Sequence, residues 1–286
     1  MKKKMPVKAV QQFMLGTVMN NEAQALDTMW KMKEAGYDGI ELCGFMIHPS
    51  GFLVKMMTKA AGMPVGNGGK LEWKRLVRDS GLKVVSIHQD LGSVERDVAS
   101  IANEAGEFDT KRIVITGMYR FPYGDMEEIK KLAERLNKAG TALKAEGIDL
   151  LYHNHNCEFL KAAPEKNAYQ ILMEETDPDV VNFEFDSYWC AECGGNPLAV
   201  MEALGSRMKL WHINDRGTRQ AGPCMTPILK SDSMELGTGA MPLVNLSGKA
   251  KELGVEAVIL ESHRNWIDKS PIKSLECSAK FLNTNF

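Results

Sequence analysis

The chain has little net charge. Its 35 lysine and arginine residues nearly balance its 37 aspartate and glutamate residues, which leaves a formal net charge of -2. A protein that binds the phosphate backbone of nucleic acid needs a clustered basic surface. The charge balance therefore argues against nucleic acid as a partner.

Long apolar runs are also missing. The longest uninterrupted apolar stretches are far shorter than the ~18 residues of a membrane-spanning helix. The first residues, MKKKMPV, are basic, but no apolar segment follows them, so we expect neither a membrane anchor nor a secretory signal. Six cysteines in 286 residues are too few for a disulfide framework and favour a cytoplasmic location.

Several nucleotide and hydrolase motifs are absent or incomplete. The first apolar run leads into Gly16-Thr17-Val18, which is not the glycine turn of a dinucleotide-binding fold. The glycine-rich segment 66–70 has Pro64 and Leu71 where a P-loop requires Gly and Ser or Thr. No Gly-x-Ser-x-Gly elbow occurs, so an α/β-hydrolase triad is unsupported. The WCAEC segment 189–193 comes too late in the chain for a thioredoxin-like motif, which favours a packing role.

What the chain does contain is a regular alternation of apolar runs and amphipathic segments. The runs are typical of parallel strands that are buried on both faces. They are Ala9–Leu15, Gly39–Cys43, Lys83–His88, Arg112–Thr116, Asp149–His155, Val180–Asp186, Lys209–Asn214 and Glu256–Glu261. Helix-period patterns lie between them and end at glycine, the usual helix C-cap. The clearest are Asn21–Ala35, Leu71–Asp79, Met126–Glu146 and Val244–Leu253.

Eight such units predict a single (β/α)₈ TIM barrel domain over residues 1–286, because ~250 residues are typical of this fold. The competing fold, an open doubly wound sheet, gathers its ligands at one crevice. Here the polar residues are spread over many strand ends. Two long segments, 44–70 and 215–233, are expected at the same mouth of the barrel, where segments of that length often act as lids.

Acidic or imidazole side chains lie at or just beyond the ends of the last four runs. Glu158 lies near the end of LLYHNHNCEF, Asp186 ends VNFEFD, His212 lies in KLWHIND, and Glu261 ends AVILE. The carboxyl ends of barrel strands converge at one mouth, so we expect these groups to meet. Carboxylate and imidazole ligands together bind divalent metals. The ordinary alternatives are a helix cap for Asp186 and a buried core position for His212.

The densest polar cluster is YHNHNCEF, residues 152–159. His153 and His155 are two residues apart and therefore share one face of a strand. Two arrangements are open: Glu158 completes a metal set and leaves His153 as a proton-transfer base, or His153 is the fourth ligand and Glu158 holds a substrate hydroxyl. We favour the first, because imidazole is the natural base near neutral pH.

Three further positions are candidates for substrate contact or charge pairing. His88 lies near the end of VVSIHQDL and Arg216 follows HIND. Their ordinary alternatives are a core or capping histidine and a surface ion pair. Glu41 in GIELCG ends the second run and has the same two interpretations.

With these residues in view, the chain resembles the xylose-isomerase-like TIM-barrel superfamily, which contains sugar phosphate isomerases and epimerases, inosose dehydratases and endonuclease IV. In epimerases of this type the metal ligands are Glu, Asp, His and Glu. Asp186, His212 and Glu261 match three of them, and His153 stands where the epimerases have a catalytic Glu. The matching stretches cover most of the chain in the expected order: GYDGIEL (36–42), VSIHQDL (85–91), YHNHNCEF (152–159), FEFDSYW with GGNP (183–189 and 194–197), LWHINDR (210–216), ELGTG (235–239) and ILESH (259–263).

The resemblance implies a metal-dependent isomerase, epimerase or elimination-type lyase that removes a proton next to the carbonyl of a sugar or keto-sugar. A less favoured implication is a DNA-repair endonuclease or a non-catalytic sugar-binding subunit. The implied cofactor is a divalent metal, Mn²⁺ first, with Mg²⁺, Co²⁺ or Zn²⁺ as alternatives. The expected roles are His153 and Glu261 in catalysis, His88, His155 and Arg216 in substrate binding, and Glu158, Asp186, His212 and Glu261 as metal ligands.

The YHNH motif also resembles the metal-binding subunit of bacterial C-glycoside deglycosidases. Those enzymes act on 3-oxo sugars and assemble with a second, smaller subunit. We therefore expect a homo-oligomer or, if this second resemblance holds, a hetero-oligomer with a smaller subunit.

Overall fold

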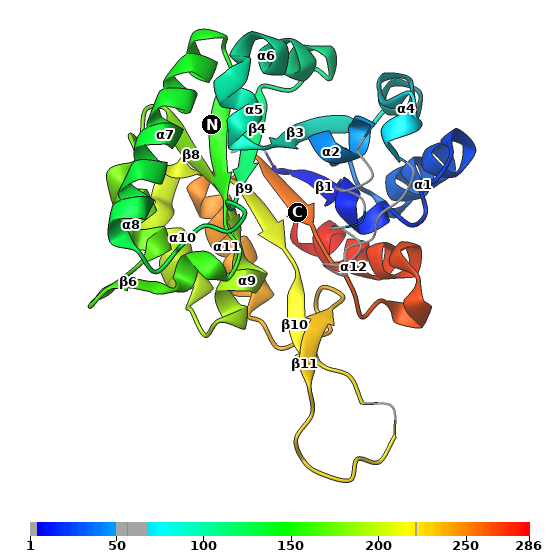
Figure 1. Ribbon diagram of the computed structural model, residues 1–286. Helices are drawn as coiled ribbons and strands as arrows, with labels where there is room; N and C mark the ends of the chain where they lie inside the picture. The colour runs from blue at the N-terminus through cyan, green and yellow to red at the C-terminus, as the bar shows by residue number, and fades with distance from the viewer. Residues whose placement is uncertain (1–4, 50–55, 57–67, 221) are drawn as a thin grey trace.

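The computed structural model describes residues 5–49, 56, 68–220 and 222–286. Eight parallel strands pair side by side into a closed barrel in the order β1-β12-β9-β8-β5-β4-β3-β2. Helices surround this barrel (Figure 1). The predicted (β/α)₈ fold is confirmed.

The barrel strands agree closely with the predicted runs. The first run was expected to reach Leu15, but the chain turns into a short 3₁₀ helix, Gln12–Leu15, because the Gln11 side chain accepts a hydrogen bond from the Phe13 N–H. The fifth strand ends at His153 rather than His155. The strands are β1 Val7–Gln11, β2 Gly39–Cys43, β3 Lys83–Gln89, β4 Arg112–Thr116, β5 Asp149–His153, β8 Val181–Asp186, β9 Met208–Ile213 and β12 Ala257–Leu260.

The predicted helix ends are also confirmed. Helix α1 begins after Asn21, whose side chain accepts from the Gln24 N–H, and ends at Gly36 with φ of 103°. Only glycine adopts this left-handed conformation without strain. The main helices are α1 Glu22–Ala35, α4 Trp73–Ser80, α5 Leu91–Arg96, α6 Val98–Glu107, α7 Met126–Ala145, α8 Ala168–Glu175, α9 Ser187–Glu192, α10 Pro197–Leu204, α11 Leu243–Leu253 and α12 Pro271–Asn285.

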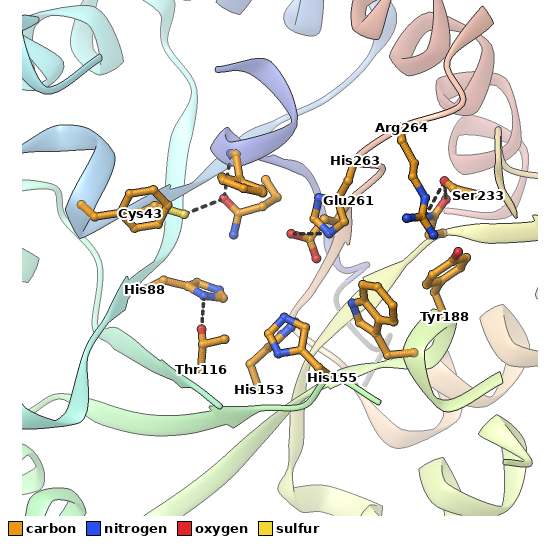
Figure 2. Close-up of a pocket in the computed structure, with 15 residues that line it drawn as sticks. Cys43, His88, Thr116, His153, His155, Tyr188, Ser233, Glu261, His263 and Arg264 are labelled. Atoms are coloured by element: carbon orange, nitrogen blue, oxygen red, sulfur yellow. Dashed lines mark hydrogen bonds and ion pairs between the residues drawn. The ribbon is translucent and has the colours of Figure 1, made fainter. Parts of the chain in front are cut away.

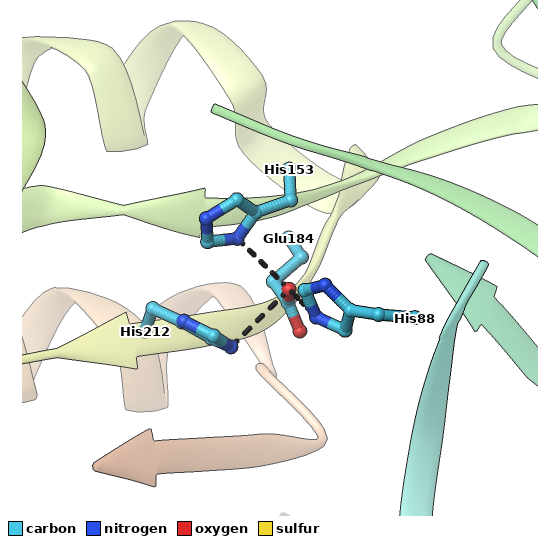
Figure 3. Close-up of side chains that lie close together, drawn as sticks. All are labelled: His88, His153, Glu184 and His212. Carbon is cyan, nitrogen blue, oxygen red and sulfur yellow. Dashed lines mark hydrogen bonds and ion pairs between the residues drawn. The ribbon is translucent and has the colours of Figure 1, made fainter. Parts of the chain in front are cut away.

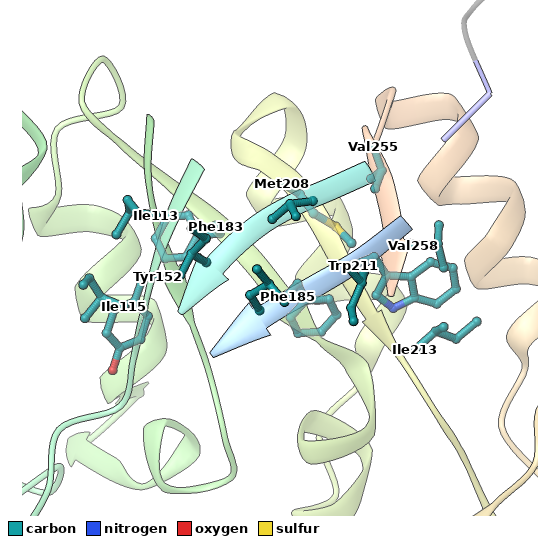
Figure 4. Packing of buried hydrophobic residues seen from close by; sticks show 14 of the residues in the cluster. Ile113, Ile115, Tyr152, Phe183, Phe185, Met208, Trp211, Ile213, Val255 and Val258 are labelled. Carbon is teal, nitrogen blue, oxygen red and sulfur yellow. The ribbon is translucent and has the colours of Figure 1, made fainter. Parts of the chain in front are cut away.

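Apolar side chains pack on both faces of the barrel wall. Between the strands and the helices lies the large outer core, which includes Trp211, Phe183, Phe185 and Tyr152 (Figure 4). Inside the barrel lies a smaller cluster of buried apolar residues: Ala9, Val85, Val114, Leu151, Leu210, Ala257 and Ile259. We call this cluster the inner plug.

The inner plug positions the polar site directly above it. Side chains two residues apart on a strand point to the same face. Leu151 is therefore followed on the inside by His153, Leu210 by His212, and Ile259 by the residue just after β12. The strands thus change from apolar to polar toward their carboxyl ends, at the mouth where TIM barrels carry their sites.

The two long connecting segments differ from the predicted loops. The first contains helix α2, Gly44–Ile47, and a 3₁₀ turn, Gly68–Lys70, and residues 50–55 and 57–67 of it lie outside the described residues. The second forms an antiparallel hairpin of β10, Asp215–Thr218, and β11, Ser231–Met234. The hairpin extends away from the barrel (Figure 1), but it begins directly after β9 at the mouth where the sequence placed this segment, and its action as a lid stays a prediction.

A second small hairpin pairs β6, Lys161–Ala163, with β7, Lys166–Asn167, after the fifth strand. Among the helices that the structure describes, none combines the length and hydropathy that a membrane crossing requires.

Candidate active site

A cavity of about 300 Å³ opens at the carboxyl ends of the strands (Figure 2). This volume is at the lower end of the range for small-molecule sites, ~300–1,000 Å³. Polar groups and aromatic rings both line it: Gln11, Phe13, Cys43, Phe45, His88, Thr116, His153, His155, Tyr188, Trp189, Asn214, Ser233, Glu261, His263 and Arg264.

His212 is the centre of the polar cluster at the base of this cavity. Its Nδ1 lies 2.9 Å from Glu261 Oε2 and 4.0 Å from Asp186 Oδ2. Its Nε2 lies 2.6 Å from Glu41 Oε2 and 3.2 Å from Glu184 Oε2. All five side chains are buried, so the imidazole is enclosed by four carboxyl groups.

This crowding of carboxylates shifts the pKa values of the cluster. Burial alone would lower the pKa of His212, but the charges of Glu184, Glu41 and Glu261 outweigh it and raise that pKa. Burial, helped by the charge of Glu261, raises the pKa of Asp186 to about 8. The site therefore favours positive charge at its centre, and a bound cation would meet that requirement.

Asp186 caps a helix, as its sequence position allowed, and it also faces the candidate ion position. As the last residue of β8, it lies beside His212 in the register of the β8–β9 pair. Its Oδ1 accepts a hydrogen bond from the Trp189 N–H at 3.0 Å and so caps helix α9. Its Oδ2 faces His212 Nδ1. The helix cap and the candidate ligand are two oxygens of one carboxyl group.

Four groups at this point lie close enough to share one ion. They are His153, Asp186, His212 and Glu261, whose ligand atoms all lie within 4.8 Å of one another. Two imidazoles and two carboxylates suit Mn²⁺, Zn²⁺ and related divalent ions. The residues present therefore fit the metal that the sequence pattern implies.

Glu158 does not lie in this group, although the sequence suggested it as a ligand. Its Oε1 accepts from the Tyr152 hydroxyl at 2.8 Å, and its Oε2 accepts from the His155 N–H at 2.9 Å. Tyr152 points outward from β5, and a buried hydroxyl needs a partner. Glu158 supplies that partner on the outer side of the strand, and the fourth group near the candidate ion position is His153.

His153 presents its two ring nitrogens to different surroundings. Its Nδ1 lies 2.9 Å from Glu184 Oε2, below the cavity. Burial lowers the pKa of His153, which favours the neutral imidazole. His155 also lines the cavity, with its ring edge-to-face against His153 at 5.0 Å between centroids. Burial lowers the pKa of His155 to about 3.

His88 differs from His153 and His155, because the pKa of its imidazole is raised. Its Nδ1 lies 2.8 Å from Thr116 Oγ1, and its Nε2 lies 3.0 Å from Glu184 Oε2 and 3.1 Å from Glu41 Oε2. Burial opposes the charged form, but Glu41 and Glu184 outweigh it and raise the pKa of His88 to about 10. At neutral pH this ring is a cation beside the cavity.

Arg216 is not brought to the cavity. Its guanidinium is paired with Glu192 at 2.5 Å, which is the ordinary ion pair that the sequence left open. Arg264 lines the cavity instead and donates from Nε to Asp232 at 2.7 Å. It lies three residues beyond Glu261 in an irregular segment, where strand periodicity gave no signal.

Two residues of the cluster were missed or left undecided by the sequence. Glu184 is two residues before Asp186 in VNFEFD, so it shares the inward face of β8. That spacing was a usable signal. Glu41 was left between two interpretations and lies fully buried beside His212.

Aromatic rings form the outer wall of the cavity. Phe13 contacts Phe45 at 6.0 Å and His263 at 5.4 Å between centroids. Trp189 stacks against His263 at 6.3 Å and meets His155 edge-to-face at 5.8 Å. We call Phe13, Phe45, Trp189 and His263 the aromatic collar. The cavity is thus polar at its base and aromatic at its opening.

The family described as a xylose isomerase-like TIM barrel matches residues 31–284. The chain belongs to this family. Its curated relatives include an inosose dehydratase from Clostridium beijerinckii, 29% identical over 139 residues. That match covers 49% of this chain and 41% of the relative, so it spans less than half of the relative's length.

Solved structures with the same fold cover nearly the whole chain. A sugar phosphate isomerase/epimerase from Parabacteroides distasonis has a TM-score of 0.74 and 24% identity, and the match covers 99% of this chain and 95% of that one. The IOLI protein with a bound zinc atom has a TM-score of 0.66 and 14% identity, over 98% of this chain and 97% of that one.

Proposed function

We propose that this protein is a divalent-metal-dependent enzyme that removes a proton from the carbon next to the carbonyl of a sugar or keto-sugar. The observation that carries the proposal is the convergence of Asp186, His212 and Glu261 at the base of a cavity in the barrel mouth. The inosose dehydratase among the relatives supports a polyhydroxylated ketone as the substrate class.

In this proposal Asp186, His212 Nδ1 and Glu261 hold the ion. Three protein ligands are usual for a catalytic site, because a further position stays available to the substrate. A divalent ion held there would polarise the substrate carbonyl and offset the negative charge that develops on its oxygen. Mn²⁺ is our first choice, and Mg²⁺, Co²⁺ and Zn²⁺ are the alternatives.

His153 is the proposed base. Its Nδ1 faces Glu184, which leaves Nε2 to accept a proton from the substrate carbon. A neutral imidazole can take up this proton, and the low pKa of His153 favours that form. Return of the proton to a carbon would complete an isomerisation or epimerisation, and loss of a hydroxyl would complete an elimination.

His88 and His155 are proposed to bind the substrate. The cationic ring of His88 suits an oxygen that gains negative charge. His155 stays neutral and offers a hydrogen bond to a hydroxyl. Gln11 and Asn214 line the same cavity and add amide groups of the type that hydrogen-bond sugars.

The aromatic collar favours a second candidate, the metal-binding catalytic subunit of a C-glycoside deglycosidase that acts on 3-oxo-glycosides. Aromatic rings at a pocket opening suit a flat or apolar substituent beyond the sugar ring. This candidate needs a smaller partner subunit. Co-purification with such a subunit, together with faster exchange on an aryl 3-oxo-glucoside than on a methyl one, would favour it over the first.

The test is proton exchange in deuterated water. Protein loaded with Mn²⁺ should incorporate deuterium next to the carbonyl of an inosose or of 3-oxo-glucose, followed by proton NMR. Absence of both bound metal and exchange would instead point to a non-catalytic sugar-binding subunit.

A matched pair of variants tests the ligand assignment. Asp186 and Asp125 both cap helices, because Asp125 accepts from the Glu127 and Glu128 N–H groups at the start of α7. Asp186→Asn should lose the metal, measured by elemental analysis, while Asp125→Asn should keep it. Equal metal content in the two variants would refute Asp186 as a ligand.

A further inference from the structure

Two carboxyl groups beneath the candidate ion position have no task in the proposed reaction. Glu41 and Glu184 have no exposed surface, and neither lines the cavity. Burying a carboxylate is unfavourable unless partners compensate it. Their partners therefore indicate what they do.

Imidazoles of the site surround Glu184 (Figure 3), and one of them, His212, also faces Glu41. Glu184 Oε2 lies 2.9 Å from His153 Nδ1 and 3.0 Å from His88 Nε2. Glu41 Oε2 lies 2.6 Å from His212 Nε2. Each of the three rings thus directs one nitrogen down to these two acids.

The two acids are anchored differently. Glu41 also accepts from Gln11 Nε2 at 2.7 Å and from the Ser86 hydroxyl. Glu184 uses one oxygen for the imidazoles, and its Oε1 has no hydrogen-bond partner among the described residues. Glu184 is therefore oriented by the histidines alone, whereas Glu41 is held in place from its own side as well.

A carboxylate only accepts hydrogen bonds, so the ring nitrogen that faces it carries the proton. A neutral imidazole has one proton, and its lone pair must then lie on the other nitrogen. For His153 the other nitrogen is Nε2. Both nitrogens of His212 face carboxylates, Nε2 toward Glu41 and Nδ1 toward Glu261. An ion held by Asp186 and Glu261 would take the place of the Nδ1 proton, so Nδ1 would offer its lone pair to the ion while Nε2 keeps its proton toward Glu41.

We propose that Glu184 and Glu41 are positioning residues that fix the tautomers of His153 and His212, so that the lone pair of each ring faces the reacting side. This inference rests on the proposed function, because it concerns the same base and the same ligand. Buried carboxylates that orient metal-binding imidazoles are a general feature of metal sites, and their loss costs ~10–100-fold in metal affinity.

¹⁵N NMR spectroscopy of the histidine rings shows directly which ring nitrogen carries the proton. The chain has only six histidines, so ¹⁵N-histidine labelling gives few signals. In the Zn²⁺-loaded protein, His153 should carry its proton on Nδ1, and His212 should carry its proton on Nε2 with Zn²⁺ on Nδ1. Glu184→Gln should convert His153 to a mixture of tautomers, because an amide group can donate as well as accept.

Zn²⁺ affinity, measured by calorimetry, supplies a second readout. Glu41→Gln should weaken Zn²⁺ binding ~10–100-fold. Glu104→Gln is the matched control, because Glu104 pairs with His48 outside the cavity. It should change only the His48 signal and leave Zn²⁺ binding unchanged. If Glu184→Gln does not fold by circular dichroism, Glu41→Gln carries the test through the His212 signal.

The outcomes separate this inference from the proposed function. Unchanged tautomers and unchanged Zn²⁺ affinity in Glu184→Gln and Glu41→Gln would overturn the positioning role. If the His153 signal responds to Glu184→Gln but the wild-type protein binds no Zn²⁺ or Mn²⁺, the tautomer control stands and the proposed metal enzyme fails.

Discussion

The lower and upper halves of the barrel interior come from the same strands but have opposite chemistry. Leu151 and Leu210 belong to the inner plug, whereas His153 and His212, two residues further along, belong to the site. The lower half gains stability from apolar burial. The upper half buries charges that must be compensated by one another or by a ligand. The apolar layer that stabilises the barrel and the polar layer that forms the site are thus only two residues apart along these strands.

The largest expected effect on the upper half comes from His153→Ala. Loss of a general base should reduce solvent exchange into the substrate by ~10²–10⁴-fold. Metal content, measured by elemental analysis, should stay the same, because Asp186, His212 and Glu261 remain. Loss of the metal in this variant would make His153 the fourth ligand rather than the base.

Metal binding at the upper half of the barrel interior should raise the free energy of unfolding. Addition of the preferred ion at about 100 times its Kd should stabilise the protein by ~2.7 kcal/mol if only the folded state binds it. Urea unfolding with and without the ion measures this difference. Asp186→Asn should abolish the gain, and a gain of equal size in that variant would contradict the ligand assignment.

A substitution in the lower half should reduce the stability of the fold and leave metal binding unchanged. Leu210→Ala removes a fully buried side chain from the inner plug and should cost ~2–5 kcal/mol of unfolding free energy. Urea denaturation measures the loss. Under conditions where the variant is folded, its metal content should match wild type. Loss of the metal from folded Leu210→Ala would show that the two halves are not separable.

A smaller effect should appear as a pH dependence of metal binding. Because the pKa of Asp186 is raised to about 8, this carboxyl group is protonated below that pH and must release its proton when an ion binds. Affinity should therefore fall as the pH drops below about 8, by at most ~10-fold per pH unit for this proton. Calorimetry at pH 6.5, 7.5 and 8.5 measures the trend, and a flat profile would contradict it.

The part of the site that the sequence predicted follows from strand periodicity. Asp186, His212 and Glu261 each stand at a strand end, and a closed barrel brings such ends together. The fold was predictable for the same reason, since apolar runs and glycine-terminated helices repeat along the whole chain. Local pattern and global topology agree at these positions.

The parts that could not be predicted depend on contacts between distant segments. Glu158 turns to the Tyr152 hydroxyl, and the end of β5 at His153 decides this direction. Arg216 pairs with Glu192 across 24 positions of the chain, and Arg264 comes from an irregular segment. In each case the side chain lies outside the eight barrel strands, so the alternation of inward and outward residues along those strands does not predict its partner.

The shared carboxyl group of Asp186 links two tasks that are usually separate. Helix α9 begins on one of its oxygens and carries Trp189, while the other oxygen faces the ion position. A substitution at this position would therefore also disturb the start of the helix and the tryptophan that lines the cavity. If the proposed function holds, adjusting this site to another metal and adjusting it to another substrate are not independent steps in its evolution.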